Sequence, residues 1–575
     1  MKKKIIYPTK LQRSWTLGIL SFLFSLQSFS QSPPWLWAKS AGGTAEDYGN
    51  SCTTDASGNI IATGYFQSPT ITFGTTVLTN AGGYDMFIVK YNPGGNVLWA
   101  KSAGGTDWDQ GISCSTDAGG NIIATGRFGS PTITFGTTVL TNAGSGGYYD
   151  MFIVKYDSGG NVLWAKSAGG TSSDLGYSCT TDAGGNIIAA GSFQSPTITF
   201  GTTVLTNAGS GYTDMFIVKY DGSGNVLWAK SAGETDWDQG ISCSTDAGGN
   251  IIATGYFQSP TITFGTTVLT NAGNEDMFIV KYDSGGNVLW AKSAGGTSAD
   301  LGYSCSTDAG GNIIAAGWFQ SPTITFGTTV LTNAGLSDIF IVKYAPGGNV
   351  LWAKSEGGTA IDYGVSCSTD AGGNIIAAGS FDSPTITFGT TVLTNAGGYD
   401  MFIVKYNPGG NVLWAKSTGG TNNDYGSSCT TDTGGNIIAT GYFYSSTITF
   451  GTTVLTNAGP GDMFIAKLDT LSIPTGNNDA SASLSMTGVF VFPNPAGNEL
   501  RIQSRVLGTE WRIESVEIFD VLGEKCLTPT LPRNTGQVSK GEGVRIDVSS
   551  LAKGIYFVTV TYDAGTKAVK KFVKM

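Results

Sequence analysis

Residues 51–102 read SCTTDASGNIIATGYFQSPTITFGTTVLTNAGGYDMFIVKYNPGGNVLWAKS, and most of the chain repeats this stretch. The tryptophan of WAKS recurs every 62 to 65 residues, and the cysteine near the start of the stretch also recurs. The repeated tryptophans are Trp37, Trp99, Trp164, Trp228, Trp290, Trp352 and Trp414, and the repeated cysteines are Cys52, Cys114, Cys179, Cys243, Cys305, Cys367 and Cys429. A period of this length indicates a modular fold in which each copy is one structural unit.

Each copy contains four segments with strand character, separated by clusters of Gly, Asn, Pro and Asp. In the first copy we expect strands at Asn50–Thr54, Asn59–Phe66, Met86–Tyr91 and Val97–Ser102, which we name A, B, C and D. The A–B and C–D connections are short and rich in Gly, which suits tight turns with positive φ. The longer B–C connection is expected to form a small hairpin. Four antiparallel strands in each of seven tandem copies predict an all-β fold, a seven-bladed β-propeller.

The two ends of the repeat array predict a closed ring rather than an open stack. A lone D segment, Trp35–Ala41, precedes the first copy, and the seventh copy ends after its C segment, at Asp469. The N-terminal strand can therefore complete the last blade and cover an edge that would otherwise pair with another chain. We assign residues 31–469 to this propeller.

The pieces GNIIATG, DMFIVKY and GNVLWAKSAGG resemble the bacterial β-propeller repeat of secreted and surface proteins, which is related in layout to NHL-type blades. The resemblance covers residues 35–469 and recurs in register in all seven copies. It implies the fold much more directly than it implies an activity.

The chain begins with the basic segment MKKKIIYPTKLQR, followed by an apolar run to Leu26 and by the small residues Ser28 and Ser30. This order is typical of a secretory signal peptide, which we expect at residues 1–30 with cleavage before Gln31. The remaining chain has 27 basic and 42 acidic side chains, a net charge of about −15 that disfavours nucleic acid and anionic lipid. No later segment predicts a transmembrane helix. We expect an exported monomer that is secreted or held at the outer cell surface.

The composition changes after residue 469. Residues 470–488 are rich in Ser, Thr, Gly and Asn and are expected to be a linker, and residues 489–575 have the alternating pattern of a small β-sandwich. This last part contains, in order, Pro493, Asn494, Pro495, Gly523, Gly554, Tyr556, Lys571 and Lys574. In these residues it resembles the C-terminal sorting domain of type IX secretion cargo in Bacteroidetes. The resemblance implies export by the type IX secretion machinery, which would be a partner of this domain.

The residue types available for catalysis are restricted. The chain has no His, which excludes mechanisms that need a histidine base or ligand. Equivalent cysteines of neighbouring blades would lie about 10 Å apart, beyond disulfide reach, so we expect them to be buried and free. The repeated Lys90 and Lys101 are expected to keep their charged ends in water.

Three aspartates recur in each copy, at Asp47, Asp55 and Asp85 in the first. They stand beside turns, where a carboxylate accepts hydrogen bonds from nearby backbone N–H groups, so we expect structural roles. The DWDQG segments at 107–111 and 236–240 space two carboxylates like part of a calcium loop, which leaves calcium as an alternative. We expect no catalytic residue, no cofactor and no metal.

The copies differ mainly in the D–A connection, at the end of strand B and in the approach to strand C. Because successive strands alternate in direction, these three places fall on one face of the disk, which we name the loop face. Aromatic residues and Arg dominate binding interfaces. The binding candidates on this face are Trp108, Arg127, Trp237, Tyr256 and Trp318. Sequence drift at loosely packed positions is the alternative explanation.

The sequence therefore predicts a non-enzymatic exported propeller that binds a protein or glycan through its loop face. One alternative is a secreted hydrolase or lyase with acidic residues in the central pocket, and another is a structural component of the surface layer or matrix. A pair of carboxylates confined to one blade would favour the enzyme, and the sequence shows no clear pair.

Overall fold

The computed structural model describes two compact units, which meet in sequence at Pro474 and Thr475. The described residues are 33–144, 146–470, 488–492, 499–505, 513–520, 525–527, 544–562 and 567–574. The expected signal peptide, residues 1–30, and nearly all of the expected linker lie outside this set. Every described secondary-structure element is a strand.

The first blade has the four strands predicted from the repeat. They are β2 (Asp47–Thr54), β3 (Ile60–Phe66), β6 (Asp85–Tyr91) and β7 (Val97–Ala103), paired antiparallel in that order. The expected hairpin between B and C is β4 (Thr70–Phe73) with β5 (Thr76–Thr79). Strand A begins earlier than predicted because a bulge between Gly49 and Ser51 extends the pairing to Asp47.

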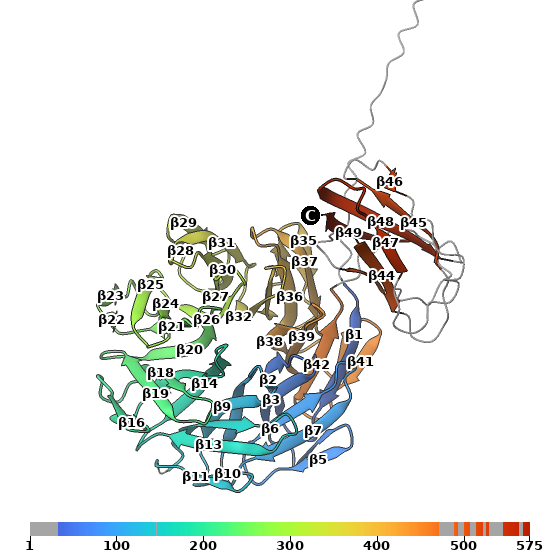
Figure 1. Cartoon of the computed structure of the whole chain (residues 1–575). Helices are drawn as coiled ribbons and strands as arrows, with labels where there is room; N and C mark the ends of the chain where they lie inside the picture. Colours follow the sequence, from blue (N-terminus) through green and yellow to red (C-terminus); the bar gives the residue numbers. More distant parts are fainter. Residues whose placement is uncertain are drawn as a thin grey trace, which may run out of the picture. The chain divides into compact units, whose positions relative to one another are not determined.

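The same arrangement is repeated around the ring (Figure 1). Blade 2 comprises β8 (Asp109–Thr116), β9 (Ile122–Phe128), β12 (Asp150–Tyr156) and β13 (Val162–Ala168); blade 3 comprises β14 (Asp174–Thr181), β15 (Ile187–Phe193), β18 (Asp214–Tyr220) and β19 (Val226–Ala232). Blade 4 comprises β20 (Asp238–Thr245), β21 (Ile251–Phe257), β24 (Asp276–Tyr282) and β25 (Val288–Ala294); blade 5 comprises β26 (Asp300–Thr307), β27 (Ile313–Phe319), β30 (Asp338–Tyr344) and β31 (Val350–Glu356). Blade 6 comprises β32 (Asp362–Thr369), β33 (Ile375–Phe381), β36 (Asp400–Tyr406) and β37 (Val412–Thr418).

Each of these blades also carries the small B–C hairpin. The hairpins are β10 (Thr132–Phe135) with β11 (Thr138–Thr141), β16 (Thr197–Phe200) with β17 (Thr203–Thr206), β22 (Thr261–Phe264) with β23 (Thr267–Thr270), β28 (Thr323–Phe326) with β29 (Thr329–Thr332), β34 (Thr385–Phe388) with β35 (Thr391–Thr394), and β40 (Thr447–Phe450) with β41 (Thr453–Thr456) of blade 7.

Blade 7 is assembled from both ends of the repeat array. It contains β38 (Asp424–Thr431), β39 (Ile437–Phe443), β42 (Asp462–Leu468) and the N-terminal strand β1 (Trp35–Ala41), which pairs with β42. The innermost strands of blades 1 and 7 meet through a hydrogen bond from Thr54 Oγ1 to the Thr431 carbonyl at 2.9 Å. Thr116 makes the same bond to Thr54 between blades 2 and 1. The ring is therefore closed, and the predicted seven-bladed propeller is confirmed.

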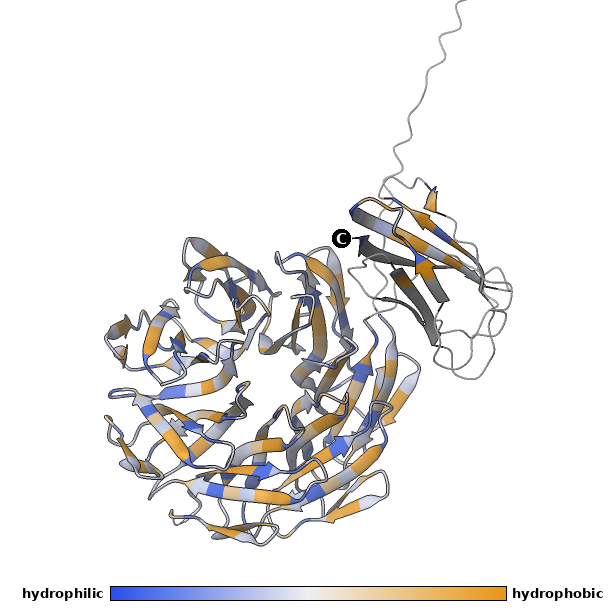
Figure 2. Cartoon of the chain, viewed as in Figure 1, coloured by the Kyte–Doolittle hydropathy of each residue, from blue (hydrophilic) through white to orange (hydrophobic). Residues whose placement is uncertain are grey.

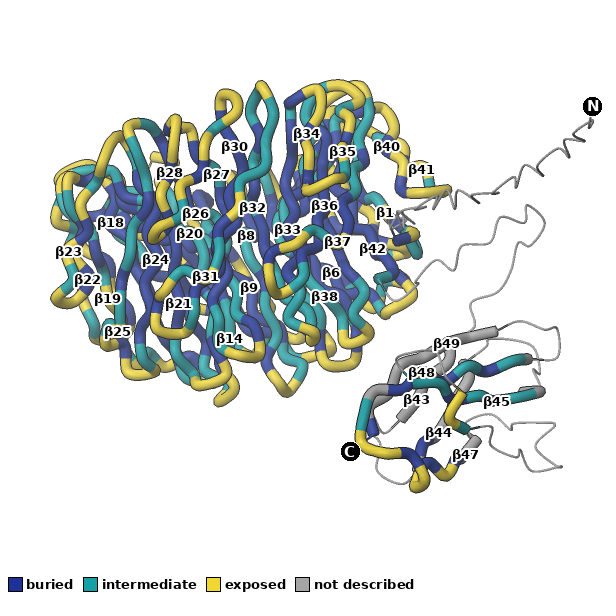
Figure 3. The backbone as a smooth tube through the Cα atoms, turned by 90° about the horizontal axis from the view of Figure 1, so that it is seen from above, coloured by how far each residue is buried: buried dark blue, intermediate teal, exposed yellow. Residues whose placement is uncertain are grey.

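The core lies between the blades, because the two middle strands of each blade bury both faces. In β6 all seven residues are buried, and in the apolar layer between blades 1 and 2 Met86 and Ile88 pack with Phe128 and Phe152. This burial explains why GNIIATG and DMFIVKY are nearly continuous apolar runs. Figure 2 shows the apolar residues along the strands, and Figure 3 shows the buried inner parts of the blades.

The turns opposite the loop face contain glycines with positive φ and lie beside buried charged side chains. Gly58 and Gly95 have φ of 75° and 80°, as expected for the A–B and C–D turns. The expectation for Lys90 is wrong: its ammonium is buried and lies 2.9 Å from Asp55 Oδ2. It also donates to the Ser158 carbonyl in the C–D turn of the next blade. Lysine on the central strand C can reach this turn, whereas Lys101 on the outer strand is exposed.

The C-terminal unit has two antiparallel sheets, as expected for a sandwich. One contains β43 (Gly488–Phe492), β44 (Glu499–Arg505) and β47 (Val544–Asp547), and the other contains β46 (Lys525–Leu527), β45 (Ile513–Phe519), β48 (Gly554–Tyr562) and β49 (Lys567–Lys574). Its buried residues include Leu500, Ile546, Val516, Ile518, Val558 and Val560.

Four residues of the sorting motif lie on one hairpin of this unit. Gly554 and Tyr556 are on β48, and they pair with Lys574 and Phe572 of β49, the strand that also carries Lys571. Tyr556 is buried and donates a hydrogen bond to the Ala552 carbonyl at 3.0 Å. Pro493, Asn494, Pro495 and Gly523 lie outside the described residues.

Candidate binding face

Backbone hydrogen bonds assemble the loop face from the three variable segments. Asp109 N, at the end of one D–A connection, donates to the carbonyl of Tyr84 in the preceding blade at 2.6 Å. Gln67 N, just after strand B, donates to the Glu46 carbonyl at 2.9 Å. The variable segments therefore adjoin one another, as the alternation of strand direction predicts.

The recurrent aspartates hold this face together. Asp47 accepts hydrogen bonds from Gly43 N at 2.8 Å and from the Ser68 hydroxyl at 2.6 Å, and Asp85 accepts one from Ala81 N at 2.8 Å. Burial raises the pKa of Asp85 to about 6. These contacts support the structural roles inferred from the sequence.

One of the two carboxylates with calcium-like spacing in blade 2, that of Asp109, takes part in the same scheme, whereas Asp107 is exposed. Asp109 Oδ2 accepts from Gly105 N at 2.7 Å and from the Ser130 hydroxyl at 2.7 Å, as Asp47 does in blade 1. Within the described part of the chain, no group of three or more His, Cys, Asp or Glu side chains is placed to hold a metal ion. The seven repeated cysteines are buried and free, as expected.

A continuous series of ten aromatic rings, which we name the aromatic arc, crosses the loop face from blade 5 through blades 6, 7 and 1 to the start of blade 2. Neighbouring ring centroids lie between 4.3 and 6.2 Å apart. In order, the rings belong to Tyr303, Trp318, Tyr363, Tyr399, Tyr425, Tyr442, Tyr48, Tyr65, Tyr84 and Trp108. Most of these pairs are edge-to-face or tilted, arrangements that aromatic side chains favour.

Two positions of the repeat create most of the arc. One is the second residue of strand A, which is Tyr48, Gln110, Leu175, Gln239, Leu301, Tyr363 and Tyr425 in the seven blades. The other is the sixth residue of strand B, which pairs with it, as Tyr65 pairs with Tyr48. The second position was noted as variable in the sequence, but the first was missed, although it also varies. In the segments DYG, DQG and DLG, the residue between Asp and Gly changes among Tyr, Gln and Leu. This change is the signal that reveals the first position.

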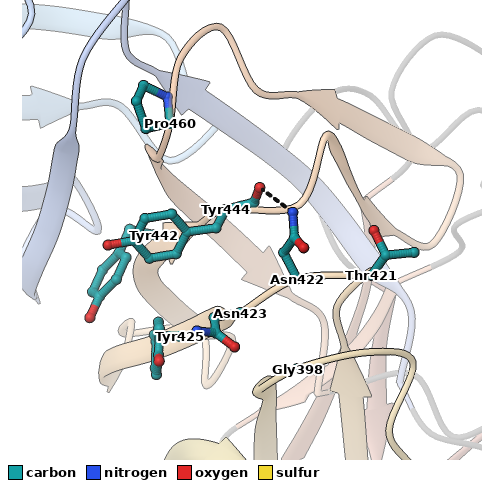
Figure 4. A pocket seen from close by; sticks show the side chains of 8 residues that line it. All are labelled: Gly398, Thr421, Asn422, Asn423, Tyr425, Tyr442, Tyr444 and Pro460. Atoms are coloured by element: carbon teal, nitrogen blue, oxygen red, sulfur yellow. Dashed lines mark hydrogen bonds between the residues drawn. The ribbon is translucent and has the colours of Figure 1, made fainter.

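A pocket of about 520 Å³ opens beside the middle of the arc. It is lined by Gly398, Thr421, Asn422, Asn423, Tyr425, Tyr442, Tyr444 and Pro460 (Figure 4). Asn422 Nδ2 donates to the Tyr444 carbonyl at 3.2 Å, and Asn423 Oδ1 accepts from Tyr399 N at 3.1 Å. The side chains at the pocket are therefore oriented by bonds to the surrounding backbone.

The hydroxyl groups of Tyr84 and Tyr425, both in the arc, remain neutral. Burial raises the pKa of Tyr84 and of Tyr425 to about 12. Tyr48 and Tyr444 share a hydrogen bond between their hydroxyls, and Tyr84 donates to Glu46 Oε2 at 3.0 Å. At physiological pH the arc can therefore donate and accept hydrogen bonds without carrying charge.

The five predicted binding residues do not form one cluster. Trp108, which is 49% exposed, and Trp318 belong to the arc. Arg127 donates to Gln110 Oε1 at 2.7 Å and lies over the ring of Tyr149. Trp237 is 37% exposed and contacts Tyr212, and Tyr256 is half-buried. Arg127 lies in blade 2, where the arc ends at Trp108, and Trp237 and Tyr256 belong to blade 4, which the arc does not reach.

The C-terminal unit matches a known family over residues 490–575, described as "Secretion system C-terminal sorting domain". Residues 490–575 are a type IX sorting domain. This domain indicates secretion to the outer surface and handling by the secretion machinery. In the part of the sorting-domain protein that the structure describes, no helix has the length and apolar character needed to cross a membrane.

The repeats are similar to WD-repeat sequences. An uncharacterized WD repeat-containing protein of Acanthamoeba polyphaga mimivirus is 26% identical over 504 residues, covering 72% of this chain and 36% of the relative. The regulatory protein FlaEY of Caulobacter vibrioides is 22% identical over 255 residues, covering 40% of this chain and 26% of the relative. The chain thus spans about a third or less of the length of these curated relatives.

Solved propellers are also similar at low identity. The Neurospora crassa Pan2 WD40 domain is 9% identical, with a TM-score of 0.36, and the match covers 77% of this chain and 98% of that one. A Synechocystis apocarotenoid oxygenase is 10% identical, with a TM-score of 0.32, and the match covers 77% and 95% of the two chains.

Proposed function

We propose that this protein is a non-enzymatic, exported propeller that binds a protein or glycan at the cell surface through its loop face. The observation that carries the proposal is the contrast between the two faces of the ring. The A–B turns read DASG, DAGG or DTGG in all copies, and the C–D turns all end in glycine and change mainly at their first two residues. The residues of the loop face differ more and include exposed aromatics. Export by the sorting domain would bring this face into contact with extracellular ligands.

The use of the recurrent acids supports a binding role over hydrolysis. Asp47, Asp55 and Asp85 and their equivalents accept hydrogen bonds from the chain's own turns and loops. A hydrolase of the glycosidase type needs two carboxylates that face a substrate. On the loop face the carboxylates of the repeat are instead committed to holding loops, which favours a surface that recognises rather than cleaves.

Alanine substitution of the five candidate residues tests the role of the loop face. The ligand would first be sought by incubating the purified full chain with a glycan array and with outer-surface proteins. Trp108→Ala, Arg127→Ala, Trp237→Ala, Tyr256→Ala and Trp318→Ala are then compared by titration calorimetry. Substitution of a true anchor should weaken binding by more than about 1 kcal/mol and leave the melting temperature nearly unchanged. Unfolding of the ring by these changes, with no separate effect on binding, would assign the residues to packing between blades and contradict the proposal.

A further inference from the structure

We propose that the aromatic arc and its pocket form a groove for a neutral polysaccharide chain. This inference rests on the proposed function and specifies its ligand. The arc occupies blades 5, 6, 7 and 1, so the groove would use one side of the loop face rather than the whole ring.

The spacing of the rings suits a ligand made of successive sugar units. A pyranose ring presents faces of C–H groups, which pack on the electron-rich faces of aromatic rings. In blades 7 and 1, Tyr425, Tyr442 and Tyr48 follow one another with centroid separations of 5.0 and 4.3 Å. Tyr425 and Tyr442 are half-buried and remain accessible to a ligand lying along the arc, whereas Tyr48, which is 7% exposed, packs against Tyr442.

The polar groups beside the rings match the hydroxyls of a sugar. Thr421, Asn422 and Asn423 line the pocket next to Tyr425 and Tyr442 (Figure 4). An amide side chain both donates and accepts hydrogen bonds, as does a hydroxyl, and sugar hydroxyls need both kinds of partner. The pocket thus combines an apolar ring surface, which matches the C–H faces of a sugar, with amides and hydroxyls, which match its hydroxyl groups.

The charges around the arc favour a neutral chain over an anionic one. Neither the arc nor the pocket lining contains Lys or Arg. Among the charges that act on its tyrosines, Glu46 raises the pKa of Tyr84 and Asp382 raises that of Tyr399, each in addition to burial. Arg127 acts on Tyr65 in the opposite direction. Arg127 is at one end, beside Gln110. Acidic polymers such as pectin or nucleic acid would therefore meet repulsion near Glu46 and Asp382.

The recessed position of the rings favours a narrow chain over a protein. Tyr48 is only 7% exposed, and the other rings of the arc, apart from Trp108, are half-buried. A stable protein interface needs roughly 800 Å² of contact on each partner, and recessed rings contribute little exposed area to such a contact. A chain one sugar unit wide can instead enter the pocket of about 520 Å³ and reach the ring edges.

The test compares neutral and acidic oligosaccharides on the full chain. Neutral gluco-, xylo- and manno-oligosaccharides of increasing length are titrated, with oligogalacturonates of matched length as the acidic series. At least one neutral series should bind with an affinity that rises with length, and the acidic series should not. Tyr425→Ala and Tyr442→Ala should each weaken binding about tenfold, whereas Tyr442→Phe, which keeps the ring, should lose less.

The control variant is Trp290→Ala, which removes a half-buried ring whose Nε1 donates to the Pro346 carbonyl in a C–D turn, on the opposite face. It should lower the melting temperature but leave glycan binding unchanged. An equal loss of glycan affinity in Trp290→Ala and Tyr425→Ala would overturn the inference. The absence of any neutral-glycan binding by a folded ring would also overturn it. Binding of a purified surface protein that is lost in Tyr425→Ala, without glycan binding, would overturn the glycan assignment while leaving the proposed function intact.

Discussion

At the scale of single residues, the buried aspartates of the ring differ in environment. Those at the start of strand A, such as Asp109, have a pKa raised by burial, and two further classes have opposite shifts. The first class, seven residues at the start of strand C, has its Oδ1 buried without a hydrogen-bond partner in the described structure: Asp85, Asp150, Asp214, Asp276, Asp338, Asp400 and Asp462. Burial raises the pKa of each to about 6. The second class, represented by Asp55, has a lowered pKa: burial opposes the shift, but hydrogen bonds from Asn59 and Lys90 outweigh it.

These two classes predict a stability maximum at mildly acidic pH. For the first class, the folded pKa is above the unfolded value of about 3.9, so its ionisation destabilises the fold as pH rises toward 6. For the second class, the folded pKa is below the unfolded value, so its stabilisation is lost as pH falls below about 4. The melting temperature should therefore be higher at about pH 5 than at about pH 8, and should drop again in stronger acid. Differential scanning fluorimetry at a series of pH values measures this dependence of the melting temperature.

A triple variant tests the assignment to the first class. Asp276→Asn, Asp338→Asn and Asp400→Asn together remove three of the seven titrating groups and should flatten the fall in melting temperature between about pH 5 and pH 8. A melting temperature that rises over this interval in the parent protein would show that other groups determine the pH dependence of stability.

At the scale of elements, strand β1 joins the two ends of the propeller. It pairs with β42, and Trp37 Nε1 donates to the Pro93 carbonyl of blade 1 at 3.3 Å. Trp35 packs against Phe450 at a centroid distance of 4.9 Å. The strand therefore contacts both sides of the closure and covers the edge of β42.

Deletion of Trp35–Ala41 should destabilise the ring and promote association. The loss of buried apolar surface costs a few kcal/mol at roughly 25 cal/mol per Å², and the bared edge of β42 can pair with another chain. We expect a lower melting temperature and dimers or aggregates in size-exclusion chromatography with light scattering. A clean monomer with the parent melting temperature would mean that β1 does not secure the closure.

At the scale of the whole molecule, the two compact units have separate tasks. The propeller carries the variable loop face, and the C-terminal unit carries the sorting residues, among them Gly554 and Tyr556 on β48. Because each unit has its own buried core, the loss of one leaves the packing of the other intact.

Deletion of Val489–Met575 should therefore leave the ring folded but stop its export. In the native host, the truncated chain is expected in the periplasm, and immunoblots of periplasmic and surface fractions would show its location. Circular dichroism of the truncated chain checks that the propeller is still folded. Normal delivery of the truncated chain to the surface would contradict the dependence of export on this domain.

The repeat alone was enough to predict the propeller. The near-identical copies indicated four strands and two tight turns per blade, and the unmatched segments at Trp35–Ala41 and before Asp469 indicated how the ring closes. Strand pairing within a blade is local in sequence, so a periodic pattern of apolar residues and turn residues determines it.

The tertiary structure decided which side chains meet across blades. The ring contact between Tyr48 and Tyr442 joins residues nearly four hundred positions apart, and it exists only because blade 1 packs on blade 7. Lys90 looked like an outer-strand lysine, yet its ammonium lies between Asp55 and a turn of the next blade. A repeat pattern fixes the place of a residue within its blade, but neighbouring blades supply its surroundings, and those surroundings make the aromatic arc.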